Sequence, residues 1–140
     1  MSHKKHQARL HAVQAVYQWQ MTGQDIREIC SQFLSDQVTP RVDTSYFSTL
    51  LVGVQENLGE LDSQLKECLD RSIESVDPVE RAILRLGAYE LILQPTVPYR
   101  VVINEAVELA KVFGAEQGHR YVNGVLDKLS RKIRNTQTAD

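Results

Sequence analysis

The stretch HRYVNGVLDKL, residues 119–129, decides between a β-hairpin and a helix. Its Asn123-Gly124 pair strongly favours a tight hairpin turn, because both residues tolerate positive φ. The neighbouring apolar residues, however, recur with helical spacing, whereas two paired strands would alternate every second residue. These apolar residues are Tyr121, Val122, Val125, Leu126, Leu129 and Ile133. The spacing therefore predicts a helix, with Asn123 and Gly124 away from its apolar stripe.

The second face of this predicted helix carries Arg120, Asp127 and Arg131 beside the Asn-Gly pair. Glycine inside a helix costs about 1 kcal/mol relative to alanine, so its presence asks for a reason. Close approach of another backbone or of a ligand is such a reason. The question that the stretch leaves is what this second face contacts.

Helical patterns also fill the rest of the chain. The spacing predicts helices over residues ~3–21 and ~25–35, another capped at Asp43-Thr44, a fourth after the break at Leu58-Gly59, and two more that begin at DPVE (77–80) and at Pro98. In DPVE an aspartate N-cap precedes a proline whose missing N–H does no harm in the first turn. We expect an all-α fold of about seven helices in two packed lobes.

The expected domain organisation is one domain over residues 1–134, followed by a polar tail. Asp77-Pro78 is the expected seam between an N-terminal lobe, about 1–75, and a C-terminal lobe, about 76–134. Residues 135–140, NTQTAD, are expected to be disordered.

Composition excludes several classes of protein. The 140 residues are 42% apolar and 24% charged, as in ordinary globular domains. Neither a signal peptide nor a run long enough to cross a membrane is evident, so we expect a cytoplasmic protein. The lone cysteines Cys30 and Cys68 provide neither a disulfide framework nor zinc-ligand spacing.

The net charge of −2 hides an asymmetry along the chain. Residues 1–24 contain Lys4, Lys5 and Arg9 and no acid, and residues 25–90 contain 13 acids against 6 bases. The chain from Arg120 onward is basic again. Basic residues also favour helix C-termini, which accounts for the last helix but not for the first. We therefore expect the two ends to share a basic surface for a polyanion.

Catalytic chemistry finds little support, and we expect no enzyme, cofactor or metal site. Phosphate-binding glycine loops, zinc-protease motifs and nucleophile elbows are absent from the sequence. His3, His6 and His11 are expected to be solvated rather than metal ligands. Glu105 and Glu108 are read as a charged helix face or as partners for Arg81 or Arg85, rather than as a catalytic pair.

Nucleic-acid binding fits the first helix better, because Lys5, Arg9, Val13 and Tyr17 share one i, i+4 line. Cations with an aromatic can hold phosphates and stack an unpaired base. The alternatives stay open: Tyr17 is equally well a core residue, and Arg9 either meets a buried acid or projects beyond the packed region. Asn123 can read a base edge or satisfy backbone groups.

At this point the chain resembles the NusB family of bacterial transcription antitermination proteins. The resemblance rests on ARLHAVQAVYQWQ, PVERAILRLGAYEL, VPYRVVINEAVELAKVFGAE and HRYVNGVLDKL, which follow in order over residues 8 to 131. It implies two three-helix lobes and binding of single-stranded boxA RNA together with NusE, a protein of the small ribosomal subunit. It further implies a place in the RNA polymerase antitermination complex that promotes read-through in ribosomal RNA operons.

The resemblance also implies site residues. The expected RNA contacts are Lys4, Lys5, Arg9, Tyr17, Phe113, Gln117, Arg120, Tyr121 and Asn123, and the expected NusE contacts are Glu80 and Arg81. The chain departs from the family in its thinned N-terminal cations, in Gln117 where an acid is frequent, and in Tyr121 for the usual phenylalanine. Histidines between the cations predict tighter RNA binding as pH falls through ~6.5.

A helical adaptor or homodimer that binds only proteins is the alternative. Gly87 and Gly124 would then mark close helix approach at a subunit interface.

Overall fold

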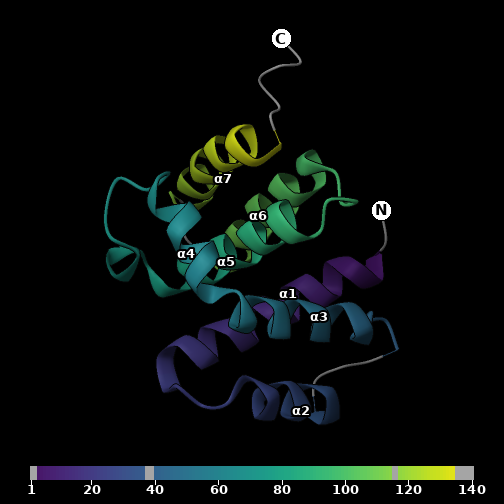
Figure 1. The fold of residues 1–140 in the computed structure, drawn as a ribbon. Helices are drawn as coiled ribbons and strands as arrows, with labels where there is room; N and C mark the ends of the chain where they lie inside the picture. Colours follow the sequence, from purple (N-terminus) through teal and green to yellow (C-terminus); the bar gives the residue numbers. More distant parts are fainter. Residues whose placement is uncertain (1–2, 37–39, 115–116, 135–140) are drawn as a thin grey trace.

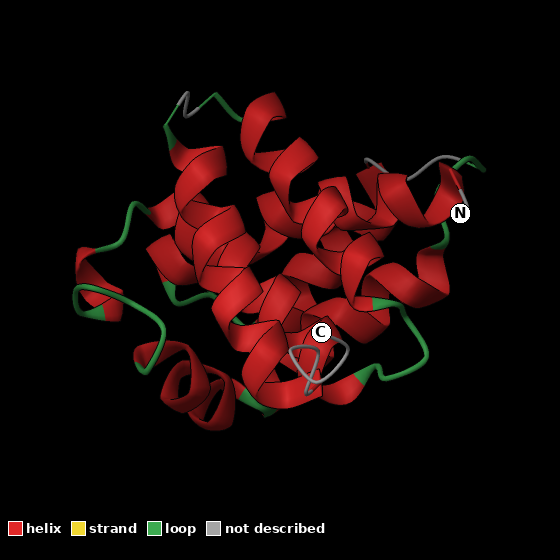
Figure 2. Ribbon diagram, turned by 90° about the horizontal axis from the view of Figure 1, so that it is seen from above, coloured by secondary structure: helices red, strands yellow, loops and turns green. Residues whose placement is uncertain are grey.

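The computed structural model describes residues 3–36, 40–114 and 117–134, and these form seven α-helices and one 3-10 turn without a strand (Figure 2). In chain order they are α1 His3–Thr22, α2 Ile26–Asp36, α3 Thr44–Glu56, α4 Leu58–Lys66, η1 Ile73–Ser75, α5 Pro78–Leu93, α6 Tyr99–Val112 and α7 Gly118–Arg134. The all-α prediction is confirmed, and Asn123-Gly124 lies inside α7. The predicted tail, residues 135–140, lies outside the described residues.

Local capping chemistry places the helix starts where the sequence predicts them. The Asp77 carboxylate accepts hydrogen bonds from the backbone N–H groups of Val79 and Glu80, and Pro78 opens α5. Asp43 caps α3 by accepting from the N–H of Tyr46 at 2.9 Å. Gly23 and Gly114 take positive φ, 71° and 94°, just beyond α1 and α6. Left-handed backbone favours glycine, so both helices end there.

Helix α5 is the centre of the molecule (Figure 1). It packs against α1 and α3 on one side and against α4, α6 and α7 on the other, and from Ala82 to Leu91 only Arg85 is not fully buried. Figure 1 shows α1, α2 and α3 gathered below α5, with α6 and α7 above. Helix α4 packs mainly on α5, and the exact seam between lobes at residues 75 and 76 stays a prediction.

Gly87 explains how closely α5 and α7 approach. A Cβ at Gly87 would lie 2.8 Å from Cδ1 of Leu126 on α7. At Gly124, in contrast, a Cβ would meet open space. Gly87 therefore serves packing within the chain, which removes one support for the subunit-interface alternative.

Candidate nucleic-acid interface

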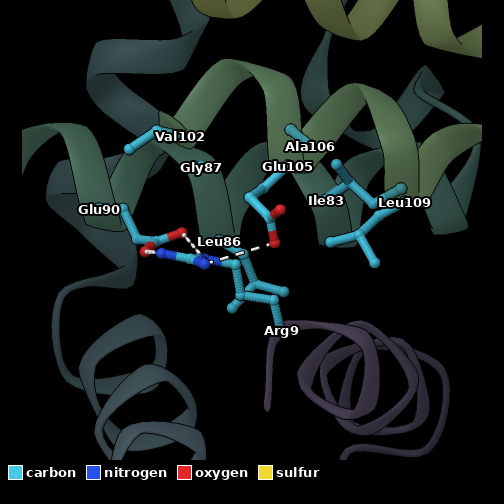
Figure 3. A pocket seen from close by; sticks show the side chains of 9 residues that line it. All are labelled: Arg9, Ile83, Leu86, Gly87, Glu90, Val102, Glu105, Ala106 and Leu109. Carbon is cyan, nitrogen blue, oxygen red and sulfur yellow. Dashed lines mark hydrogen bonds and ion pairs between the residues drawn. The ribbon is translucent and has the colours of Figure 1, made fainter. Parts of the chain in front are cut away.

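Arg9 lies inside the protein, where it joins α1 to α5 and α6 (Figure 3). Its Nε and Nη2 donate to the Glu90 carboxylate at 3.0 and 2.8 Å, and Nη1 donates to Glu105 at 3.3 Å. The residue is 2% exposed. Of the two possibilities that the helical wheel left open, the structure shows the buried acid. The prediction that Arg9 touches RNA directly is therefore wrong for this structure, because no surface is left for a phosphate to reach.

Tyr46 of α3 completes what we call the Arg9 cluster: Arg9, Tyr46, Glu90 and Glu105. Its hydroxyl donates to Glu90, and the Arg9 Cζ lies 5.3 Å from the centre of its ring. Burial alone would lower the pKa of Arg9, but the hydrogen bonds and charge of Glu90 raise it overall. Burial and the charge of Glu90 raise the pKa of Tyr46. The cluster thus keeps Arg9 charged and Tyr46 protonated.

His6 extends this cluster toward the start of α1. Its Nδ1 lies 2.9 Å from Glu105 Oε1. A charged carboxylate only accepts hydrogen bonds, so the ring nitrogen is the donor in this contact. Neither Glu105 nor Glu108 meets the predicted partners Arg81 and Arg85: Glu108 pairs with Lys111 at 3.7 Å.

The first turn of α1 presents the predicted lysines near the start of α3. Lys4 is exposed, and its backbone carbonyl accepts from the N–H of Asp43 at 3.1 Å. Lys5 is 3.3 Å from the Asp43 carboxylate, whose pKa is lowered by the N–H of Tyr46 and by Lys5. Tyr17, further along α1, is 38% exposed.

The start of α7 forms a second basic and aromatic area. A shallow depression there is lined by Cys68, Asp70, Arg120, Tyr121, Gly124, Val125 and Lys128. Arg120 and Asn123 are exposed and Tyr121 is half-buried. Phe113 at the end of α6 is half-buried and Gln117 is exposed, with residues 115–116 between them outside the described part.

The α4–α5 connection supplies Asp70 to this depression and Arg71 next to it, two residues that sequence reasoning missed. Asp70 accepts from Arg71 Nε at 2.7 Å and from the Tyr121 hydroxyl at 3.2 Å, and the Arg71 Cζ lies over the Tyr121 ring, 4.6 Å from its centre. The Arg71 guanidinium lowers the pKa of Asp70, while partial burial and Asp70 raise the pKa of Tyr121. We call Asp70, Arg71 and Tyr121 the surface triad.

The start and the end of α7 lie differently with respect to Arg9. Arg134, at the end of α7, donates to the backbone carbonyls of Glu90 and Leu91, close to the Arg9 cluster. Tyr121 lies at the other end of α7, about 20 Å along the helix at 1.5 Å per residue. Helix α5 separates α1 from α7 (Figure 1). Arg9 and Tyr121 therefore do not lie side by side, and a basic surface shared by the two ends stays a prediction.

The two predicted partner residues lie at the start of α5. Glu80 is half-buried, and its pKa is raised by burial and by the nearby charge of Asp77. Arg81 Nη1 donates to the carbonyls of Ile73 and Glu74, both at 3.4 Å, and so holds the α4–α5 connection. Arg85 is occupied by Asp62, at 2.8 Å, and by Gln20.

Neither a metal site nor a membrane span is found in the described part of the chain. No group of three or more potential metal ligands occurs among those residues. None of their helices is both long and apolar enough to cross a bilayer.

The arrangement of the helices defines the class of protein. It is an all-helical protein with the architecture of the NusB structures, and it carries exposed cations and aromatic residues. A crystal structure of antitermination factors NusB and NusE in complex with dsRNA matches with a TM-score of 0.86 and 27% identity, covering 94% of this chain and 99% of that one. The solution structure of NusB from Aquifex aeolicus matches with a TM-score of 0.80 and 27% identity, covering 98% and 93%.

Sequence comparison gives the particular family. The model of the NusB family matches residues 6–131. Transcription antitermination protein NusB of Nitrosococcus oceani is 54% identical over 137 residues, 98% of this chain and 92% of that protein. The protein of the same name from Shewanella amazonensis is 52% identical over 126 residues, 90% and 94% of the two chains. The chain belongs to the NusB family of transcription antitermination proteins.

Proposed function

We propose that this protein is an antitermination factor that binds single-stranded boxA-type RNA together with NusE and promotes read-through in ribosomal RNA operons, acting in the cytoplasm. The observation that carries the proposal is the match to NusB in a complex with NusE and dsRNA, at a TM-score of 0.86 over nearly the whole of both chains. Curated relatives with more than half of their residues identical are antitermination proteins.

The RNA contacts in this proposal fall into two separate areas. Lys4, Lys5 and Tyr17 provide cations and an aromatic ring on α1, and Phe113, Gln117, Arg120, Tyr121 and Asn123 surround the start of α7. An extended single strand can pass from one area to the other, so that lysines bind phosphates while exposed rings stack bases. Arg9 supports the first area from inside the protein and does not contact RNA.

The NusE contact in this proposal lies at the start of α5. Glu80 supplies a carboxylate there, and Arg81 fixes the neighbouring α4–α5 connection through the carbonyls of Ile73 and Glu74. The same connection carries Asp70 and Arg71, which bind Tyr121. NusE seated there would lie beside the α7 area, where it extends the surface available to RNA.

Fluorescence anisotropy with a labelled boxA-type RNA tests the proposal. We expect saturable binding that NusE tightens, weaker binding of a scrambled strand, and weaker binding of a duplex of the same sequence. Four or five phosphate contacts predict a slope of about −3 in a plot of log affinity against log salt concentration. Lys4→Ala with Lys5→Ala should reduce both affinity and slope.

Arg27→Ala is the matched control, because Arg27 is an exposed arginine of α2 that pairs with Glu56 and belongs to neither area. It should bind RNA like the unchanged protein. Clean capture of NusE with no saturable binding of any RNA would refute the proposal and favour an adaptor that binds only proteins.

A further inference from the structure

We propose that Arg71 is an RNA-binding residue, and that its guanidinium is the platform on which one unpaired base stacks. This inference rests on the proposed function and deepens it, because it adds a residue to the α7 area. The starting observation is that the Arg71 guanidinium already lies over the Tyr121 ring, with Cζ 4.6 Å from the ring centre. One face of Tyr121 is therefore covered by Arg71.

The pairing with Asp70 determines which part of Arg71 can meet a ligand. Arg71 Nε and Nη2 donate to the two carboxylate oxygens of Asp70, at 2.7 and 3.2 Å. This bidentate pair occupies one edge of the guanidinium and holds its plane in place. The face turned away from Tyr121 and the remaining nitrogen, Nη1, are not used by the pair. The Arg71 side chain is 47% exposed, so that a ligand has access to it.

A base fits this surface better than a phosphate. Asp70 places a negative charge directly beside Arg71, which weakens the attraction of a phosphate group. Stacking on a guanidinium plane needs no net positive charge, and arginine planes are a common stacking partner for unpaired bases in RNA. A base on the outer face would complete a stack of three layers: base, Arg71 and Tyr121.

The neighbouring residues suit a nucleotide held in this way. The depression beside the triad is bordered by Arg120 and Lys128, neither of which is taken up by the Asp70–Arg71 pair. These cations can bind the phosphates on either side of the stacked base. Gly124 lines the same depression, and open space lies where its Cβ would stand, so that the backbone of α7 leaves room for the strand.

The experiment uses boxA-type RNAs in which 2-aminopurine replaces one base at a time, with the full chain and NusE present. We expect fluorescence quenching at one position on binding, because stacking quenches this base. Arg71→Ala should abolish that quenching and weaken binding about tenfold, as for the loss of one stacked base. Arg71→Lys keeps the charge but not the plane, and should lose the quenching as well.

Two controls separate the outcomes. Arg27→Ala removes a comparable exposed, ion-paired arginine of α2 and should change neither quenching nor affinity. Thermal unfolding of Arg71→Ala should match that of the unchanged protein. RNA binding and quenching that survive in both Arg71 variants would overturn the inference and leave the proposed function intact. Absence of RNA binding by the unchanged protein would overturn both.

Discussion

Within residues 3–36, 40–114 and 117–134, arginine, carboxylate and tyrosine meet once in the core and once at the surface. In the Arg9 cluster the side chains of Arg9 and Glu90 are 3% and 4% exposed, and in the surface triad those of Arg71 and Asp70 are 47% and 66% exposed. Both contain a bidentate ion pair, a tyrosine hydroxyl that donates to the carboxylate, and a guanidinium over the tyrosine ring.

The two clusters differ in their exposure to water. Charges without water must satisfy one another, so that removal of one partner leaves another charge buried without compensation. Charges in water lose little when a partner is removed, because solvent replaces it and screens what remains. The same three groups therefore hold helices together in the core, whereas at the surface they remain available to a ligand.

The largest expected effect comes from Arg9→Ala. It leaves the buried Glu90 and the half-buried Glu105 without this cation, so we expect the free energy of unfolding to fall by about 3–5 kcal/mol. Urea denaturation followed by circular dichroism measures this loss. The matched surface variant, Arg71→Ala, should unfold like the unchanged protein. An Arg9→Ala protein of normal stability with weakened RNA binding would contradict the structural role and return Arg9 to the surface.

The second comparison replaces each tyrosine by phenylalanine. Tyr46→Phe removes a hydrogen bond to a buried carboxylate, which should cost about 1.5–3 kcal/mol. Tyr121→Phe keeps the ring under Arg71 and should leave unfolding unchanged. Because burial and Glu90 raise the pKa of Tyr46 above its ordinary value of 10.0, its hydroxyl stays protonated in the folded state.

The pH dependence of Tyr46→Phe provides the check. A raised folded pKa means that the contribution of Tyr46 is complete below pH 10 and is lost as pH rises. The difference in unfolding free energy between the unchanged protein and Tyr46→Phe should therefore shrink above pH 10. A constant difference across that range would show that the hydroxyl contributes nothing through its proton.

Local signals explain why the fold could be predicted from the sequence. Helix α5 begins at Pro78 because Asp77 caps it, and that chemistry is contained within four residues. The helical spacing of the apolar residues from Tyr121 to Ile133 predicts α7 rather than a hairpin. Glycines with positive φ follow the ends of α1 and α6. The alternative reading alone places the close approach at Gly87, at a subunit interface, because the spacing of one helix does not say which neighbour it meets.

The candidate site could be predicted only in part, because its decisive contacts are distant in sequence. Arg9 and Glu90 are separated by 81 positions, and no local pattern pairs them. A signal was present: Glu90 follows Leu86 by four residues on a buried stripe, and such an acid requires a cation. Asp70 and Arg71 lie in a connection between helices, where there is no apolar spacing from which a structure could be predicted. Tyr121, which contacts Asp70, is 51 positions away in the sequence.

The smallest expected effect concerns an ion pair of intermediate exposure, Lys5 with Asp43, at 40% and 29%. Asp43→Ala removes both this pair and the cap of α3, and we expect a loss of about 1 kcal/mol at neutral pH, mostly from the cap. Asp43→Asn keeps a capping oxygen and should lose less.

The N–H of Tyr46 and the charge of Lys5 lower the pKa of Asp43 below its ordinary 3.8, so that its contribution to stability is present above that value and fades as pH falls. Urea titrations below pH 4 should therefore bring the unchanged protein and Asp43→Ala together. Equal losses of stability in Asp43→Ala and Asp43→Asn at neutral pH would instead show that the ion pair with Lys5 contributes more than the cap. This half-exposed pair would then stabilise the fold as the buried pair of Arg9 and Glu90 does.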